Sequence, residues 1–250
     1  MSRWRWLRAM GWGVMASLSA GCAATQAGWQ THPQDPFEAT NRGISAFNDQ
    51  LDSTLLRPVA SAYQQVTPEW AQTGVRNVFG NLTDIWSTFN LALQLKPMET
   101  AETGLRAGVN TVFGVYGLLD WGSQIGLQRH KADFGQTLGY WGVPAGPYVV
   151  LPVLGPSNVR DTAGWLVDSQ GGLWSDVTPD SVRYLGTALN LVDKRASYLA
   201  MDRQLDQLAL DKYTFIRDAY MQRRRAATQR DQQGLDSSRD QEGKEPRYDQ

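Results

Sequence analysis

The amino-acid sequence predicts an all-α, compact domain with one irregular segment that is rich in glycine and proline. Apolar residues recur at spacings of three and four over most of the 250-residue chain, which is typical of helices that bury one face. Several prolines stand directly before such stretches, where they favour the first turn of a helix. Residues 104–155 differ, because they contain 11 of the 24 glycines. We therefore expect a set of helices interrupted once by a loop or hairpin.

The first 22 residues carry the features of a bacterial lipoprotein signal. Three arginines precede an apolar stretch that is too short and wrongly flanked for a membrane-spanning helix. The stretch ends in Leu18-Ser19-Ala20-Gly21-Cys22, which resembles a lipobox, and Cys22 is the only cysteine. We expect residues 1–21 to be cleaved and Cys22 to be lipidated, which leaves 21 basic and 25 acidic residues and a charge of −4. A plain signal peptide with Cys22 as a free thiol is the alternative.

The first half of the folded domain is expected to be a series of helices after a tether. Residues 22–34 are small and polar and form the lipidated tether, and residues 35–228 form the helical domain. Asp35, Pro36 and Glu38 fit a capping box at the start of the first helix. That helix carries an apolar stripe, and further helices are predicted to begin at three prolines. The stripe is Ile44, Phe47, Leu51 and Leu55, and the prolines are Pro58, Pro68 and Pro97.

The second half of the domain begins with the irregular segment. Residues 143–155 are apolar but contain three prolines, which excludes both a long helix and a central strand. After this segment, Ser157 is expected to cap a short helix, Thr178-Pro179 precedes a longer one, and a last helix begins near Asp211. Residues 229–250 hold many charged and almost no apolar side chains, so we expect a disordered tail.

The composition excludes several kinds of site. Two histidines and one cysteine are too few for a His/Cys metal site, so we expect no metal. With 24 basic and 25 acidic residues, the chain lacks the positive excess that nucleic-acid binding favours. No motif for a catalytic nucleophile, a nucleotide or another cofactor occurs. Nothing in the sequence argues for an enzyme, a cofactor or a nucleic-acid partner.

Two stretches are unusually poor in charge, since residues 77–95 contain only Asp84 and residues 107–128 only Asp120. A helix that is apolar on most faces is either buried in a core or in contact with lipid, and both interpretations stay open. If these helices contact lipid, their aromatic side chains are candidate lipid contacts. These are Phe79, Trp86, Phe89, Phe113, Tyr116 and Trp121. The basic run 223–225 is predicted to be a solvated helix end, with contact to anionic lipid as the alternative.

Four ordered segments resemble the VacJ/MlaA family of outer-membrane lipoproteins, over about residues 35–225. They are Asp35-Pro36-Phe37-Glu38 with Asn41-Arg42, then Arg57-Pro58-Val59-Ala60, a long run from Asp133 to Asp161, and Arg217-Asp218-Ala219-Tyr220. The residues that carry the resemblance most clearly are Asp35, Pro36, Asn41, Arg42, Phe134, Gly135, Leu138, Gly139, Gly142, Pro144, Gly146, Pro147, Tyr148, Pro152, Gly155, Arg160 and Asp161. Thr40 departs from the family pattern, where an aromatic residue is usual.

The resemblance implies a ring-shaped helical protein in the inner leaflet of the outer membrane, on its periplasmic side. It implies three kinds of partner: phospholipids, an outer-membrane porin trimer, and a periplasmic lipid carrier linked to an inner-membrane ABC transporter. We therefore expect a lipoprotein without enzymatic activity that removes mislocalised phospholipids from the outer leaflet and maintains lipid asymmetry. A structural, porin-associated lipoprotein that moves no lipid is the alternative, and a lipid hydrolase on a helical fold ranks behind both.

Overall fold

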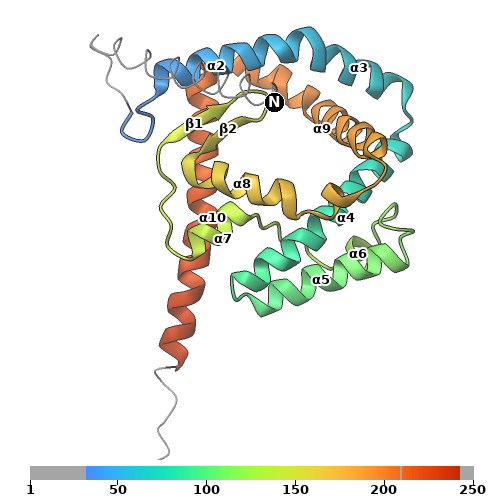
Figure 1. Cartoon of the computed structure of the whole chain (residues 1–250), viewed down its shortest axis with the longest axis vertical. Helices are drawn as coiled ribbons and strands as arrows, with labels where there is room; N and C mark the ends of the chain where they lie inside the picture. The colour runs from blue at the N-terminus through green and yellow to red at the C-terminus, as the bar shows by residue number, and fades with distance from the viewer. Residues whose placement is uncertain (1–31, 209, 243–250) are drawn as a thin grey trace, which may run out of the picture. The chain divides into compact units, whose positions relative to one another are not determined.

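The computed structural model describes residues 32–208 and 210–242, and it consists mainly of α-helices (Figure 1). The expected signal peptide, Cys22 and nearly all of the tether lie outside these residues. A single antiparallel pair of strands is the only sheet in the described part of the chain. None of the described helices is long and apolar enough to cross a membrane. The predicted all-α class with one irregular segment is confirmed.

The chain begins with a long, continuous helical stretch made of α2 (Glu38–Leu51), the π-helical turn η2 (Asp52–Leu56) and α3 (Arg57–Val66). Pro58 lies in the first turn of α3, but the backbone stays helical through Leu56, so it does not open a separate helix. The wider π turn just before Pro58 accommodates a residue that lacks a backbone N–H. The predicted capping box is wrong, because α2 begins after Phe37 without a side-chain cap.

Two antiparallel helices follow, α4 (Glu69–Leu93) and α5 (Pro97–Val112). Pro68 lies directly before α4 and Pro97 in the first turn of α5, as predicted from their fixed φ angles. A tight loop leads to the short α6 (Trp121–Gln124), and α7 (Phe134–Tyr140) begins at Asp133, whose side chain caps it.

The apolar segment rich in proline forms a hairpin, one of the two forms that its sequence predicts. Strand β1 (Tyr148–Leu151) pairs antiparallel with β2 (Gly155–Asn158), in a register that places Tyr148 opposite Asn158. Helix α8 (Val159–Gly171) follows directly, and its cap is Asn158 rather than the predicted Ser157. The Asn158 side chain accepts a hydrogen bond from the backbone N–H of Asp161, which an asparagine at this position does well.

The last elements are the 3₁₀ turn η3 (Leu173–Asp176), α9 (Asp180–Leu208) and α10 (Lys212–Glu242). Both long helices begin where the sequence predicts. The tail, however, differs from the expectation of disorder from residue 229, because α10 continues to Glu242. Residues 229–242 contain no proline and one glycine, and seven of the 14 residues are Gln, Arg or Glu, which have high helix propensity. A helix that is already formed upstream therefore propagates through them.

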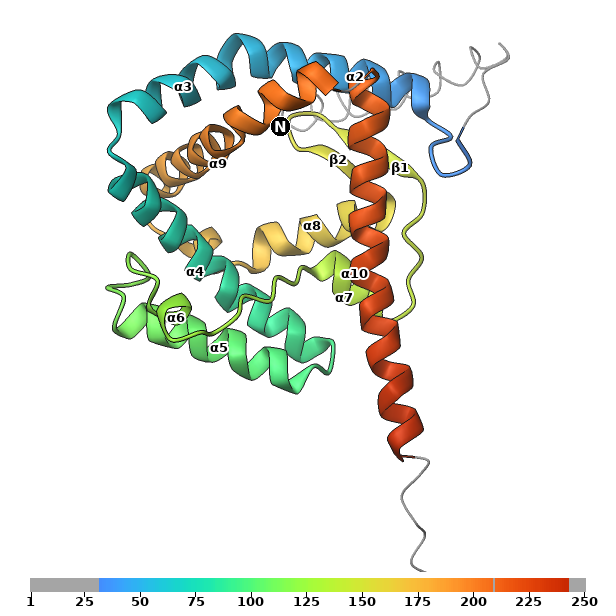
Figure 2. The same ribbon diagram turned by 180° about the vertical axis from the view of Figure 1, so that it is seen from behind.

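Within the unit that spans residues 33–250, the ribbons follow one another around a ring (Figures 1 and 2). The continuous helix α2–α3, helix α4, helix α8 and the hairpin with α10 form its sides, and α9 packs along α3. Helix α5 packs against α4 on the outside of this ring. This arrangement agrees with the ring that the family resemblance implies.

Candidate functional site

Helix α5 buries polar side chains and exposes apolar ones, which is the reverse of a helix on the surface of a water-soluble protein. Its buried residues include Thr103, Arg106 and Asn110, each at most 2% exposed. Its outer face instead carries Leu105 and Val112, which are 57% and 73% exposed. A helix on a water-soluble domain turns its apolar stripe toward the core. Because α5 turns it outward, this face is suited to contact lipid.

The loop after α5 extends this exposed face with aromatic side chains. Phe113, Tyr116 and Trp121 are 68%, 81% and 47% exposed, and all three are predicted lipid contacts. The backbone that carries them is tightly bonded, since the N–H of Tyr116 donates to the carbonyl of Thr111 at 3.0 Å. We call this surface, made of Met98, Leu105, Val112, Phe113, Val115, Tyr116, Leu118, Leu119, Trp121 and Ile125, the apolar surface.

A group of four charges, of which Asp84 and Arg106 are buried, lies between α4, α5 and the loop that carries the apolar surface. Arg106 donates to Asp84 at 3.3 Å and to Asp120 at 2.6 Å, and Arg129 donates to Asp84 at 3.0 Å. Arg106 also donates to the carbonyl of Leu127 at 2.7 Å. Burial raises the pKa of Asp84, although the charges of Arg129 and Arg106 oppose the shift. Two carboxylates and two guanidinium groups neutralise one another, so the loop is held from inside by ionic bonds.

The other three predicted lipid contacts lie on α4 and face different neighbours. Phe79 packs edge-on against Trp174, with ring centroids 5.1 Å apart. The indole N–H of Trp86 donates to Asp168 at 2.7 Å, and its ring stacks on Phe89. Phe89 itself is 53% exposed. The structure therefore brings the six candidates together as two groups of three, one in the apolar surface and one along α4.

The residues that carry the family resemblance converge on the hairpin and on α10. Asp35 is fully buried and accepts hydrogen bonds from Asn41 at 2.8 Å and from the Tyr213 hydroxyl at 2.6 Å. Asn41 also donates to the carbonyl of Tyr148 at 3.1 Å and accepts from the N–H of Val150 at 2.9 Å. These hydrogen bonds connect strand β1 to helix α2. They explain why Asp35 and Asn41 are polar although they are buried.

Asp161 is the centre of a second buried group, on the other side of the hairpin. It accepts hydrogen bonds from Arg160 at 3.0 Å, from the Tyr220 hydroxyl at 2.6 Å and from Arg224 at 2.6 Å. Burial alone would raise the pKa of the Asp161 carboxyl, but Arg224, Tyr220 and Arg160 hold it below its usual value. Arg224 also donates to Asp133 at 2.6 Å, so α10 is tied to α7 and α8 at once. We call Asp35, Asn41, Tyr148, Asp161 and Tyr220 with their bonded partners the motif region.

Two glycines of α7 allow the close packing in the motif region. A Cβ on Gly139 would lie 2.5 Å from Nη1 of Arg160, so only glycine leaves room for that guanidinium. Gly135 lies against α8, where a Cβ on Gly164 would be 2.4 Å from the backbone nitrogen of Gly135. The two helices therefore cross with backbone against backbone.

The remaining family residues shape the edges of the same region. Arg42 lies on the surface and pairs with Asp211 at 2.7 Å and with Glu38 at 2.8 Å. The N–H of Phe134 donates to Asp168 at 3.0 Å. Leu138 lies in α7, Pro147 precedes β1, Pro36 precedes α2, Pro152 and Gly155 flank the hairpin turn, and Gly142, Pro144 and Gly146 border a pocket.

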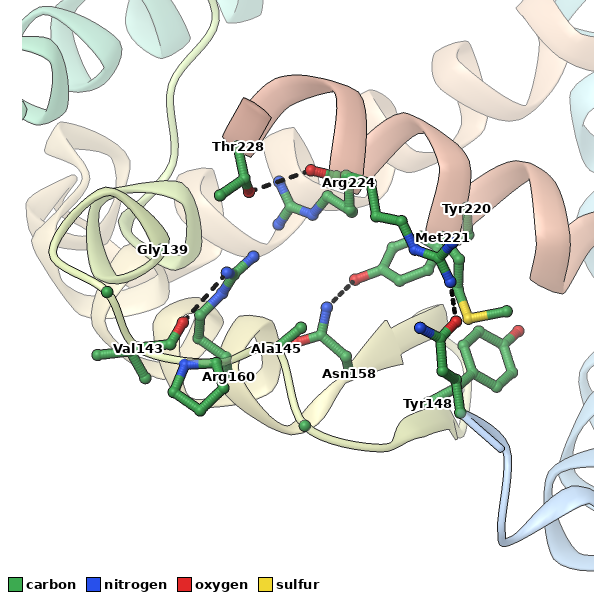
Figure 3. Close-up of a pocket in the computed structure, with 15 residues that line it drawn as sticks. Gly139, Val143, Ala145, Tyr148, Asn158, Arg160, Tyr220, Met221, Arg224 and Thr228 are labelled. Carbon is green, nitrogen blue, oxygen red and sulfur yellow. Dashed lines mark hydrogen bonds between the residues drawn. The ribbon is translucent and has the colours of Figure 1, made fainter. Parts of the chain in front are cut away.

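This pocket has a volume of about 300 Å³ and lies between α7, the 142–146 loop, the base of the hairpin and α10 (Figure 3). Arg160, Arg224 and Arg225 all border it, together with Tyr148 and Tyr220. None of the six predicted lipid contacts does. In the described part of the chain, no group of His, Cys, Asp and Glu side chains is arranged to hold a metal ion.

The pairing of several important residues over long distances has no signal in the sequence. Asp84 and Arg106 lie 22 positions apart, and Arg224 and Asp133 lie 91 apart. The interpretation of run 223–225 as a solvated helix end is wrong for Arg224, because its side chain is 17% exposed and bonded to two carboxylates. Helical periodicity places Arg224 on the same face of α10 as Tyr213, Arg217 and Tyr220, and this stripe was the available signal.

Comparison with known proteins gives a family for the chain. Residues 33–227 match the family model described as MlaA lipoprotein. The chain is 36% identical over 212 residues to the intermembrane phospholipid transport system lipoprotein MlaA of Escherichia coli strain K12, and the match covers 83% of each chain. It is 33% identical over 196 residues to an uncharacterized protein of Rickettsia bellii, a match that covers 78% of this chain and 77% of the other.

A solved structure agrees with these relatives. It comes from work called "Structural basis for maintenance of bacterial outer membrane lipid asymmetry", and its sequence is 32% identical to this one. The superposition has a TM-score of 0.68 and covers 78% of this chain and 98% of that chain. The family resemblance of the sequence is therefore confirmed. This chain belongs to the MlaA lipoprotein family.

Proposed function

We propose that this protein removes mislocalised phospholipids from the outer leaflet of the outer membrane and passes them to a periplasmic carrier. Its MlaA relatives are named as lipoproteins of an intermembrane phospholipid transport system. The observation that carries the proposal is the reversed polarity of α5, which exposes Leu105 and Val112 and buries Thr103, Arg106 and Asn110. Such a surface is stable when lipid covers it and costly when water does.

The protein is associated with the outer membrane, and we propose that a lipid on Cys22 anchors it there on the periplasmic side. Several acyl chains on one cysteine give stable anchoring, since each buried methylene contributes about 0.8 kcal/mol. Replacement of Cys22 by alanine should leave an unprocessed precursor that does not reach the outer membrane. Normal sorting and normal function of Cys22→Ala would contradict the anchor.

We propose a passive role in transport, in which this protein offers a path and does not supply energy. Direction would come from the periplasmic carrier and from the inner-membrane ABC transporter to which it delivers lipid. An outer-membrane porin trimer is the second proposed partner, and it would hold the protein beside the outer leaflet. The six aromatic candidates on α4 and in the apolar surface are the proposed contacts to lipid.

The test is the amount of phospholipid exposed on the surface of cells that lack this protein, with and without a plasmid copy. We expect surface phospholipid to rise in the deletion strain and to return to normal with the plasmid. Unchanged surface phospholipid together with altered porin assembly would favour a structural, porin-associated lipoprotein instead. Release of fatty acid from phospholipid by the purified protein would favour a hydrolase.

A further inference from the structure

The pocket beside α10 is lined by both apolar and arginine side chains (Figure 3). Val143, Pro144 and Met221 contribute apolar atoms to its lining. Arg160, whose side chain is 4% exposed, places its guanidinium among these atoms from the start of α8. A ligand that suits this lining has one charged group and a short apolar body.

The guanidinium of Arg160 has N–H donors to spare. Its Nε donates to Asp161 at 3.0 Å, and its Nη2 also lies 3.0 Å from that carboxylate. Its Nη1 has only a long contact of 3.4 Å to the carbonyl of Val143. A guanidinium carries more donors than these contacts use, so some have no partner among the described residues. Gly139 lets Nη1 lie directly against the backbone of α7, because a Cβ there would lie 2.5 Å from it.

The pocket and the carboxylates bonded to its arginines carry a net positive charge. Arg160 and Arg224 are balanced by two carboxylates behind the lining, those of Asp161 and Asp133. Arg225 lines the pocket as well, is exposed, and donates to the neutral side-chain oxygen of Gln34. An anion competes well for this guanidinium, since hydrogen bonds between charged groups are roughly twice as strong as neutral ones.

We propose that this pocket binds a phosphate group carried on a short apolar body, as in the headgroup and glycerol of a phospholipid. Arg225 and the unused donors of Arg160 bind the phosphate oxygens, and Val143, Pro144 and Met221 contact the glycerol and the first acyl carbons. The choice of a phospholipid over a free phosphate rests on the proposed function, whereas the phosphate itself follows from the lining.

The test uses the full-length protein in a neutral detergent and measures binding by isothermal titration calorimetry. The probes are dihexanoylphosphatidylglycerol, inorganic phosphate and dihexanoylglycerol, which lacks a phosphate. Arg225→Gln removes the exposed cation of the pocket. Arg223→Gln is the matched control, because Arg223 is exposed on the same helix and does not line the pocket. We expect Arg225→Gln to weaken binding of the phospholipid about tenfold and Arg223→Gln to change it less than about twofold.

Four outcomes would overturn the proposal or part of it. Equal weakening by both variants would show a diffuse effect of charge, and equal binding of dihexanoylglycerol would show that the phosphate is not recognised. No binding of either phosphate-bearing probe would also overturn it. Binding of inorganic phosphate as tight as that of the phospholipid would overturn the assignment to a lipid. These results do not depend on surface phospholipid in the deletion strain, so the pocket and the proposed function can fail separately.

Discussion

The motif region and the apolar surface both rest on buried polar groups, but they differ in where their side chains point. In the motif region, Asp35 and Asp161 are buried and bonded to tyrosines and arginines from α10. In the apolar surface, the side chains point outward, and Tyr116 is 81% exposed. The motif region therefore holds helices and strands together, and the apolar surface exposes its side chains to the surroundings of the protein. Changes in the first should lower the stability of the fold, whereas changes in the second should alter contact with lipid.

The largest effect is expected for Asp161→Ala. The variant removes the acceptor shared by Arg160, Tyr220 and Arg224, and leaves buried charge unpaired. Loss of one partner from a buried ion pair costs about 3–5 kcal/mol. We expect a large fall in the melting temperature in detergent, measured by circular dichroism.

The control for this variant is Asp180→Ala. The Asp180 side chain is 68% exposed and pairs with Arg183, three residues along the same helix. An exposed pair of this kind contributes little, so the melting temperature should hardly change. If both variants lowered it equally, the motif region would not have the structural role that we assign to it.

A second test compares two glycines inside helices. Gly164→Ala places a Cβ against the backbone of Gly135 and should destabilise the protein by about 1–3 kcal/mol. Gly108→Ala lies on the exposed side of α5 with no atom near its Cβ. There, alanine should stabilise the helix by about 0.5–1 kcal/mol. Urea unfolding monitored by tryptophan fluorescence would show the opposite signs, and equal signs would contradict the close crossing of α7 and α8.

The local features of this protein could be predicted from the sequence, but its long-range pairs could not. Pro68 and Pro97 mark helix starts because their φ angles are fixed, and the prolines of residues 143–155 exclude a helix. Asp35 looked like a helix cap, yet its partner is Tyr213, which lies 178 positions away. Helical periodicity says which residues share a face of one helix, but not which face meets another.

The same limit explains the partial success with the candidate site. Low charge in residues 77–95 and 107–128 pointed to both groups of aromatic candidates, and three of them do form an exposed surface. Composition could not show that Trp86 in α4 donates a hydrogen bond to Asp168 in α8, because the two residues lie 82 positions apart in the sequence. It also could not show that α5 buries Thr103, Arg106 and Asn110 and exposes Leu105 and Val112.

The pH dependence of stability should depend on the motif region. Burial, assisted by the charge of Asp35, raises the pKa of Tyr148 from 10.0 to about 12. The folded state therefore prefers the neutral tyrosine, so its contribution is complete below pH 10 and is lost as the pH rises toward 12. At pH 11, the wild type should have lost about 1 kcal/mol more than Tyr148→Phe, whose side chain does not titrate.

Urea unfolding of both proteins at pH 9 and at pH 11 measures this difference. Tyr213 and Tyr220 remain in both proteins, so their ionisation cancels in the comparison except for the part of the Tyr213 shift that the charge of Tyr148 causes. If the two proteins lost equal stability between these pH values, the Tyr148 hydroxyl would be exposed to water and not buried.

The smallest effect on stability, and the sharpest difference between the two regions, is expected for single cysteines at Phe113 and Phe37. Both side chains are more than half exposed, so Phe113→Cys and Phe37→Cys should each change stability by less than about 0.5 kcal/mol. Phe113 belongs to the apolar surface, and Phe37 lies directly before α2, beside the motif region. In lipid nanodiscs, an acyl-chain nitroxide should quench a bimane label at position 113 more strongly than one at position 37.

The wild type is the control for labelling, because Cys22 is its only cysteine and should not react when it carries a lipid. Labelling of the wild type would therefore contradict the proposed anchor. A label at position 113 that is not quenched would show that the apolar surface does not contact acyl chains and would contradict the lipid contacts proposed there. Equal quenching at both positions would mean that lipid also reaches the motif region, and the separation between a supporting region and a lipid-facing surface would then be lost.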